Sequence, residues 1–469
     1  MHIEQIYTGC LAQGAYYIES NGEVAIIDPL REVQPYIEKA FKRNAKIKYI
    51  FETHFHADFV SGHVTLAEKT GATIVYGPLA NPLFDAHIAS DGEIFKLGDI
   101  TLTALHTPGH TMESTVYLLK DAHGKDHAIF SGDTLFLGDV GRPDLAQKAA
   151  NMTQEQLAGL LFDSLRSKIM TLADDVIVYP AHGAGSACGK NLSKETVGTL
   201  GEQKLTNYAL RADMTREEFI YEVTDGLLPP PAYFPMNVKL NKEGYQNVEE
   251  IIEKNKALNP DEFELLANEI DALILDVRHQ DDFSKGHIPG SIFIGLDGGF
   301  APWVGALILD YKQPILLVTP EGREQEAITR LSRVGYDYTV GFLKGSFEAW
   351  RNAGKEFDTL TSITPQELEL KLQHQKVPVF DVRKPGEYQS EHLEIAESTP
   401  LDFLNDHLAT FPSNETFYVH CAGGYRSVIA ASILKARGVH NLVDVKKGFS
   451  GLKETQIPRT NYVCPSTLK

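Results

Sequence analysis

Apolar segments with two different spacings alternate along the first 225 residues or so of the chain. Residues 24–28 and 47–51 are short, mostly apolar runs, which are typical of buried strands. Residues 34–43 and 153–172 instead place apolar residues at helical spacing, and Thr153 stands where an N-cap is expected. Strands and helices are therefore predicted to alternate through the first part of the chain.

A repeat follows a proline-rich break in this pattern. Residues 227–235 carry consecutive prolines, which stop helix and strand alike, and we expect this segment to pack along the first domain as an extended arm. Beyond it, residues 273–278 recur in altered form as residues 377–383. A spacing of roughly 100 residues exceeds the periods of solenoid repeats, so it predicts two duplicated α/β domains. The expected limits of the three domains are 1–245, 255–357 and 361–469.

Composition narrows the classes of partner. The chain has 469 residues, and a hydrophobic share of 43% lets it bury several cores. Its net charge of −19 repels phosphate backbones, so no nucleic-acid partner is expected. The four cysteines lie far apart, which favours a reduced, cytoplasmic protein. The first residues lack the pattern of a signal peptide, and no apolar run approaches the ~20 residues that cross a bilayer, so no membrane partner is expected.

Metal-ligating residue types follow several of the predicted strands. His54, His56 and Asp58 are spaced by single residues directly after the run 47–51. The matching residues downstream also end β-segments, and they are His110, Asp133 and His182. Imidazole and carboxylate groups at neighbouring strand ends converge readily on one metal ion.

This order of residues resembles the metallo-β-lactamase fold family. The resemblance implies an αββα sandwich over the first half of the chain, with the metal at one edge between two sheets. Two-metal hydrolases of the glyoxalase II type normally carry a histidine directly after the aspartate of this motif. Here Phe59 follows Asp58, and a phenyl ring cannot coordinate a metal. A second metal, and with it two-metal hydrolysis, is therefore disfavoured.

One mononuclear branch of the family, the persulfide dioxygenases, resembles this chain more closely. That resemblance implies one Fe(II) per chain, held by His54, His110 and Asp133 with open positions for substrate and oxygen. His56, Asp58 and His182 would then orient these ligands or a water molecule. The run 132–144 also resembles the dioxygenases, and its Arg142 either braces the loop or contacts substrate.

Cys188 lies just beyond His182 in a glycine-rich loop. One interpretation is a buried, inert thiol, because free cysteines are usually buried. The other places the thiol near the iron, where it would handle persulfide, because the glycines allow the loop to approach closely. A cysteine in this loop of fused relatives favours the second interpretation without deciding it.

The duplicated domains resemble rhodaneses. In the second copy, Cys421 ends an apolar strand and begins a glycine-bearing loop that leads into a helix, a place that stabilises an anion such as a thiolate. Arg426 would bind an incoming anion such as sulfite, or pair with an acid of its own domain. In the first copy, Thr319 stands where the cysteine should be and Pro320 lacks a backbone donor, so this copy is expected to be inactive.

The order of the three predicted domains resembles fusions of a persulfide dioxygenase with rhodanese domains, which belong to the α/β multidomain class. This implies oxidation of a low-molecular-weight persulfide by O2 to sulfite, followed by sulfur transfer through Cys421 to give thiosulfate, in sulfide detoxification. The resemblance also implies a homo-oligomer, a dimer or tetramer. Two alternatives stay open: a glyoxalase II-like thioester hydrolase fused to a sulfur-carrier rhodanese, and a sulfur carrier whose metal domain only binds.

Overall fold

The computed structural model describes residues 1–190 and 192–464. The chain divides into two compact units, each described below by itself. The first comprises Met1–Val248 and Ser332–Gly335, and the second comprises Glu249–Leu331 and Tyr336–Lys469. The predicted limits of the three domains stay a prediction.

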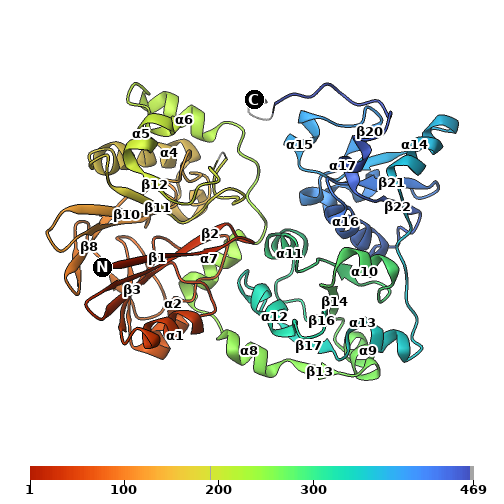
Figure 1. Cartoon of the computed structure of the whole chain (residues 1–469), viewed down its shortest axis with the longest axis horizontal. Coiled ribbons are helices and arrows are strands. Elements are labelled where there is room, and N and C mark those ends of the chain that lie inside the picture. The colour runs from red at the N-terminus through yellow and green to blue at the C-terminus, as the bar shows by residue number, and fades with distance from the viewer. Residues whose placement is uncertain (191, 465–469) are drawn as a thin grey trace. The chain divides into compact units, whose positions relative to one another are not determined.

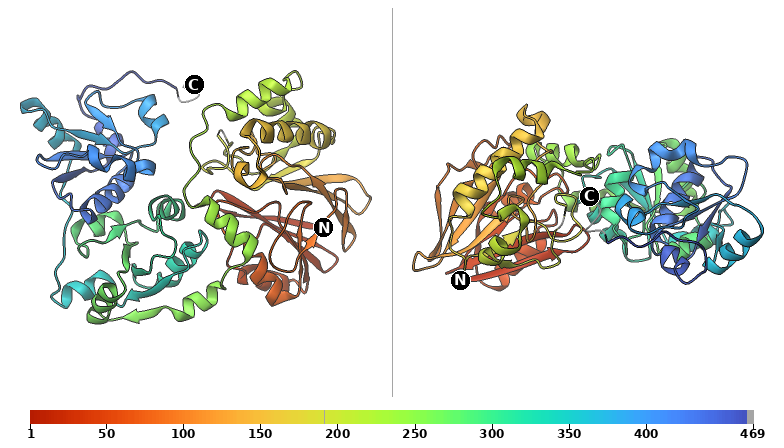
Figure 2. Two further views of the ribbon diagram at one scale, coloured as in Figure 1. Left: turned by 180° about the vertical axis from the view of Figure 1, so that it is seen from behind. Right: turned by 90° about the horizontal axis from the view of Figure 1, so that it is seen from above.

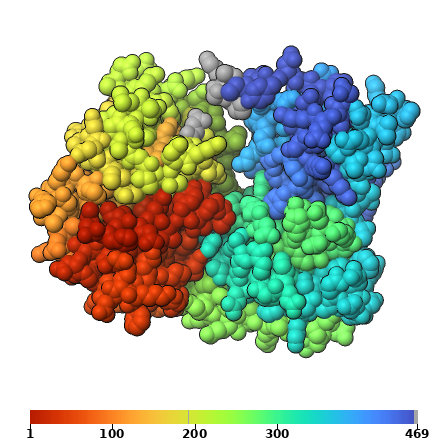
Figure 3. Space-filling model, viewed as in Figure 1, coloured from red at the N-terminus to blue at the C-terminus, as the bar shows by residue number. Residues whose placement is uncertain are grey.

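The first unit contains two six-stranded sheets, which form separate layers (Figures 1 and 2). The strands of the first sheet, in spatial order, are β1 (His2–Thr8), β2 (Gln13–Ser20), β3 (Glu23–Ile27), β4 (Lys46–Phe51), β5 (Thr73–Tyr76) and β6 (His87–Ile88). Those of the second are β12 (Gly198–Thr199), β11 (Ile177–Pro180), β10 (Asp126–Gly132), β9 (Thr115–Lys120), β8 (Ile100–His106) and β7 (Ile94–Leu97). The outer strand β1 is half exposed, and the N-terminal residues, in red, form part of the surface (Figure 3).

Helices cover the outer face of each sheet. Successive residues of a strand point to opposite faces, so each strand packs both against the other sheet and against the helices. In β3, Ile27 packs between the two sheets with Phe51 and Phe130, whereas Ile26 packs outward with Tyr36 of α1. On the other side, Leu161 of α4 packs over the second sheet. The helices of this unit are α1 (Gln34–Lys42), α2 (His63–Thr70), α3 (Gln147–Ala150), α4 (Gln154–Ser164), α5 (Leu200–Thr206), α6 (Arg216–Thr224) and α7 (Phe234–Glu243). The predicted αββα sandwich is confirmed.

Two sequence predictions about helices need correction. The helix expected over 153–172 begins at Thr153, which forms a capping box with Gln156, but α4 gives way to a π-helix, Leu165–Ile169. The segment 227–235 is not extended throughout. Helix α7 begins at Phe234, with Pro235 in its first turn, where a missing backbone N–H costs no hydrogen bond.

The second unit holds two five-stranded parallel sheets with the same strand order, which is the structural form of the sequence repeat. The strands of the first, in spatial order, are β13 (Lys256–Leu258), β17 (Thr339–Leu343), β16 (Ile315–Val318), β14 (Leu273–Asp276) and β15 (Ile292–Phe293). The corresponding strands of the second are β18 (Ser362–Ile363), β22 (Leu442–Val445), β21 (Phe417–His420), β19 (Val379–Asp381) and β20 (Ala396–Ser398).

Helices accompany both sheets of this unit. Helix α8 (Val248–Lys254) precedes the first sheet. With it go α9 (Pro260–Glu269), α10 (Gln280–Lys285), α11 (Phe300–Leu307), α12 (Glu324–Ser332) and α13 (Ser346–Asn352). The second sheet has α14 (Pro365–His374), α15 (Pro385–Ser390), the 3-10 segment η3 (Leu401–Thr410), α16 (Tyr425–Ala436) and α17 (Gly448–Leu452). Among the described residues, no helix combines the length and the apolar character needed to cross a bilayer.

Candidate functional site

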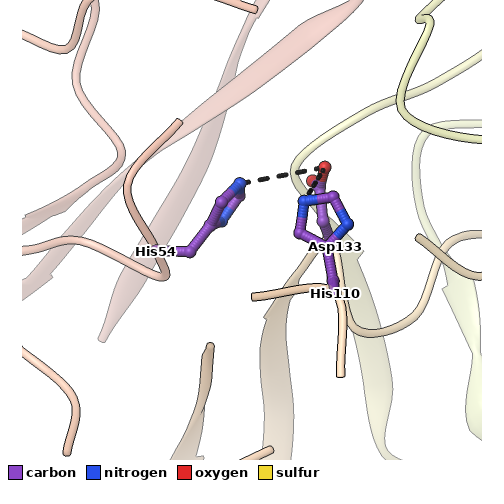
Figure 4. Close-up of side chains that lie close together, drawn as sticks. All are labelled: His54, His110 and Asp133. Carbon is purple, nitrogen blue, oxygen red and sulfur yellow. Dashed lines mark ion pairs between the residues drawn. The ribbon is translucent and has the colours of Figure 1, made fainter. Parts of the chain in front are cut away.

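The three predicted ligands, His54, His110 and Asp133, lie close together at one edge of the sandwich (Figure 4). The Nε2 atom of His110 lies 3.3 Å from Oδ2 of Asp133, and Nε2 of His54 lies 3.8 Å from the same oxygen. All three side chains are buried, and their nearest ligand atoms lie within 4.8 Å of one another. The structure therefore brings together a donor group of two imidazoles and one carboxylate.

Parallel strands set this convergence, because their carboxyl ends meet at the same edge of a sheet. In the first sheet, β3 pairs with β4 so that Ile27 lies opposite Phe51, just before His54. In the second sheet, β10 pairs with β11, and Gly132 lies opposite Pro180, which places Asp133 near His182. Gly132 has a φ of +53°, and a Cβ there would lie 2.6 Å from Cβ of Thr53. A larger residue would therefore force the two sheet edges apart.

Hydrogen bonds at the Nδ1 atoms fix the orientation of both imidazoles. The Thr53 hydroxyl donates to Oδ2 of Asp28 at 2.8 Å, so its oxygen accepts from Nδ1 of His54 at 3.0 Å. Nδ1 of His110 donates to the backbone carbonyl of Arg142 at 2.9 Å. Each Nε2 atom is thereby left as the acceptor that faces Asp133, as a metal ligand requires. Burial lowers the pKa of His54, which keeps this imidazole neutral.

The Asp133 carboxylate provides the test of whether a cation fits. Both of its oxygens are buried and receive no hydrogen bond from the described residues. An ionised carboxylate without donors is costly to bury, and a bound cation removes that cost. The donor set therefore fits a metal ion, as expected for a metallo-β-lactamase fold.

A second donor group borders the first. His56, Asp58 and His182 also lie within ligand distance of one another, and Nε2 of His182 is 3.5 Å from both Asp58 and Asp133. His56, however, points its Nε2 toward Asp28 at 3.1 Å, and the Phe59 ring packs against it at 4.4 Å between centroids. The predicted roles of these three residues stay predictions.

Buried carboxylates surround His56 on its other side. Nε2 of His56 lies 3.5 Å from Glu52, which is also buried. Burial opposes the charged imidazolium, but Asp28 and then Glu52 more than offset it and raise the pKa of His56. This residue is therefore engaged as a partner of two carboxylates.

The structure places Cys188 beside Asp133 and His182. Its thiol is buried and lies within 4.8 Å of ligand atoms of Asp133 and His182. Burial, followed by the charges of Asp58 and Asp133, raises the pKa of this thiol. Of the two interpretations of Cys188, the position matches the one near the metal, while its role stays a prediction.

Arg142 braces the loop that carries it. Its guanidinium bonds both oxygens of Asp144, at 2.6 and 2.7 Å, and the carbonyl of Leu228 at 2.6 Å. Its backbone N–H donates to the carbonyl of Cys188 at 2.9 Å. Arg142 therefore ties the loop after Asp133 to the loop of Cys188.

Sequence reasoning missed Asn241, which holds the histidine motif from a distant helix. Its Nδ2 donates to the carbonyls of His56 and Phe59, both at 2.8 Å, and its Oδ1 accepts from the N–H of Ser61 at 2.8 Å. Asn241 is fully buried on α7, about 180 residues along the chain, so no local pattern pointed to it.

We expect Asn241→Ala to destabilise the first unit by roughly 2 kcal/mol or more, because buried backbone groups at the motif lose their partners. Asn237→Ala is the matched control, since Asn237 is buried on the same helix and its side-chain atoms have no hydrogen-bond partner among the described residues. Urea unfolding of the full chain measures both. Equal losses of stability in the two variants would contradict the assigned role of Asn241.

In the second unit, Cys421 directly follows β21. The thiol is buried, and the backbone N–H of Gly424 donates to its Sγ at 3.1 Å. Gly424 has a φ of +105°, which favours glycine at this turn. Arg426 bonds both carboxylate oxygens of Glu387, at 2.6 and 2.9 Å, so it pairs with an acid of its own domain. Its predicted role toward an incoming anion stays a prediction.

In the corresponding loop of the first, cysteine-less copy, a side-chain carboxylate accepts the backbone N–H of the loop. Equivalent backbone bonds, from Val277 to Val318 and from Val382 to His420, place Thr319 where Cys421 stands. A carboxylate oxygen of Glu324 accepts from the N–H of Gly322 at 3.1 Å and lies 3.4 Å from the Thr319 hydroxyl. The Glu324 carboxylate thus accepts from the backbone N–H that corresponds to the Gly424 N–H, which faces Sγ of Cys421 in the second copy.

A cavity of about 340 Å³ lies beside this loop, lined in part by Arg278, Lys285 and Arg351. Arg278 pairs with Asp276 at 2.6 Å, and Lys285 lies 3.7 Å from Asp282. Arg351 pairs with Glu348. Each of these cations is thus already close to a carboxylate.

Two family models match the chain. The metallo-beta-lactamase superfamily matches residues 8–182, and the rhodanese-like domain matches residues 259–353 and 364–455. Human mitochondrial persulfide dioxygenase ETHE1 is 30% identical over 222 residues, which are 47% of this chain and 78% of the human protein. A solved metallo-beta-lactamase from Staphylococcus aureus subsp. aureus COL is 32% identical, with a TM-score of 0.65, over 73% of this chain and 99% of that one.

Hydrolases are also among the relatives. Cytoplasmic hydroxyacylglutathione hydrolase from Arabidopsis thaliana is 35% identical over 178 residues, which are 37% of this chain and 65% of the plant protein. The match therefore spans less than two thirds of that relative.

The sandwich and its buried group of candidate metal ligands define a protein of metallo-β-lactamase type with two rhodanese-like domains attached. The chain belongs to the metallo-β-lactamase superfamily, and its domain order fits a fusion of a persulfide dioxygenase with rhodanese domains. This confirms the resemblance predicted from the sequence.

Proposed function

We propose that this chain is a non-haem Fe(II) persulfide dioxygenase coupled to a thiosulfate-forming sulfurtransferase. The observation that carries the first activity is the Asp133 carboxylate, which is buried without hydrogen-bond donors and faces two Nε2 atoms. His54, His110 and Asp133 would hold one iron, since two imidazoles and a carboxylate suit Fe(II) and leave positions open. When bound, the iron would supply the redox chemistry that O2 and sulfur need.

The overall oxidation balances as RSSH + O2 + H2O giving RSH and sulfurous acid, which ionises to sulfite. The residues of the chain bind and orient in this reaction. Thr53 and the Arg142 carbonyl hold the imidazoles. His182 and Cys188 lie within ligand distance of Asp133, with Asp58 beside His182, and these residues would contact a persulfide bound there. Phe59 covers His56 and helps to exclude water from that side.

The sulfur transfer uses Cys421. Its thiolate attacks the outer sulfur of a second persulfide, so the carrier thiol leaves and a cysteine persulfide remains. Sulfite then attacks the outer sulfur of that persulfide, thiosulfate leaves, and the Cys421 thiolate is restored. The Gly424 N–H, 3.1 Å from Sγ, supports the anionic sulfur in both steps.

A second candidate function is thioester hydrolysis with two metal ions. The donor group of His56, Asp58 and His182 and the hydroxyacylglutathione hydrolase relatives favour it. Phe59 in place of a ligand and the engagement of His56 by Asp28 oppose it.

We expect His110→Ala to bind no stoichiometric metal and to lose oxygen uptake roughly 100-fold or more, because a ligand is removed. His106→Ala is the matched control, since His106 is four residues earlier and bonds the carbonyl of Met112 instead. Elemental analysis and an oxygen electrode measure the two effects. A His110→Ala protein that keeps its metal and rate would exclude the proposed ligand set.

We expect Cys421→Ser to consume oxygen at the wild-type rate and to release sulfite in place of thiosulfate, because only the transfer step is lost. Cys464→Ser, which changes an exposed cysteine, is the control and should leave the products unchanged. Chromatography of labelled sulfur products measures both. Thiosulfate from the Cys421→Ser protein at the wild-type yield would assign the transfer to another residue.

A further inference from the structure

Helix α16, which follows the Cys421 loop, is buried on more than one side. Its residues 427–434 are all buried. A helix that packs only on its own sheet buries one stripe of its surface. Eight consecutive buried residues therefore need cover from a second partner. Within the second unit, that cover includes β15 and α10 of the cysteine-less copy.

Two hydrogen bonds attach this helix to the cysteine-less copy, and an ion pair attaches its last turn to the segment that directly follows that copy. The Tyr425 hydroxyl donates to the carbonyl of Gly295 at 2.7 Å. The Ser432 hydroxyl oxygen accepts from the N–H of Phe293 at 2.9 Å. The Lys435 ammonium pairs with Asp358 at 2.8 Å. Spacings of seven and three residues place the three side chains on one helix face.

The Tyr425 side chain packs against Gly298, Phe293 and Gly295 of the cysteine-less copy, and we call these three residues the seat of Tyr425. A Cβ added to Gly298 would lie 2.2 Å from Cζ of Tyr425, so the ring lies directly over this glycine. The Phe293 ring packs against it edge-on, with the centroids 5.9 Å apart. Burial and the nearby Asp297 raise the pKa of Tyr425, so its hydroxyl remains a donor to Gly295.

Tyr425 directly follows Gly424, whose N–H lies 3.1 Å from Sγ of Cys421. A shift of the tyrosine therefore moves the donor that faces the reactive sulfur. We propose that the cysteine-less domain positions the sulfur-transfer loop through the seat of Tyr425, with Tyr425 as the positioning residue. This inference rests on the proposed transfer function of Cys421.

Gly298→Ala tests the seat in the full chain, because the new Cβ must displace the ring. We expect kcat/KM for thiosulfate formation to fall roughly ten- to hundredfold, since misplaced reacting groups cost rate steeply. Gly299→Ala is the matched control. Its Cβ would lie 3.4 Å from the Trp303 ring, an ordinary contact, so its rate should not change. A Gly298→Ala protein with wild-type transfer would overturn the proposal.

The time course of Cys421 alkylation, followed by mass spectrometry of its peptide, gives a rate profile that reports the geometry of the loop without any sulfur transfer. Gly298→Ala should change the rate in this profile roughly threefold or more, because the N–H donor that faces the sulfur is no longer aligned with it. Tyr425→Phe keeps the ring and removes one hydrogen bond, so we expect a loss of only roughly three- to tenfold in transfer rate. An unchanged profile in Gly298→Ala would overturn the proposal, even if transfer were slower.

A double variant separates positioning from general damage. In Tyr425→Ala the ring is gone, so adding Gly298→Ala should cost no further rate, and the two changes should be non-additive. Additive losses would show that Gly298 acts by another route and would contradict the proposal. If wild-type protein formed no thiosulfate while the alkylation profiles still shifted as expected, the transfer function would fail and the positioning would stand.

Discussion

The first unit is organised around the buried carboxylate of Asp133, which the described residues leave without a hydrogen-bond partner. Two sheets deliver Asp133 and two imidazoles to one edge, and no donor among the described residues bonds the carboxylate. Burying such a charge opposes folding unless a cation compensates it. The surrounding contacts hold this arrangement in place: Thr53 and the Arg142 carbonyl fix the rings. Metal affinity and the stability of this edge are therefore linked.

Much of this could be predicted from the sequence because the signals are local. Strand spacing indicated that ligand residue types stand at strand ends, and the resemblance of their order to the metallo-β-lactamase family implied the sandwich and the three residues that converge. The repeat around residues 273–278 and 377–383 indicated two like domains, which the identical strand orders confirm. In each case the pattern lies within a few residues of the feature that it predicts.

The missed features depend on contacts between distant segments. Asn241 contacts the histidine motif from α7, far along the chain. The prolines of residues 227–235 predicted an extended segment, but Pro235 lies in the first turn of α7, which begins at Phe234. The contact of His56 with Asp28 also requires two segments to meet in the core, since Glu52 lies only four residues before His56. In the cysteine-less loop, the sequence indicated a missing thiol but not that Glu324 takes over the vacated donor.

The proposed function places two sulfur chemistries in one chain, and the two sites that would carry them differ in the charge that they favour. The first site leaves an anionic carboxylate to hold a cation, whereas the Cys421 loop offers a backbone N–H to an anion. In the proposed function, sulfite made at the first site is the nucleophile at the second. The cysteine-less copy holds α16 through two hydrogen bonds, and we propose that this support is its role.

The most direct measurement is the metal content of protein purified without oxygen, combined with oxygen uptake on low-molecular-weight persulfides. The account predicts one iron per chain and one O2 consumed for each persulfide oxidised. Two zinc ions per chain, with thioester hydrolysis and no oxygen uptake, would contradict it.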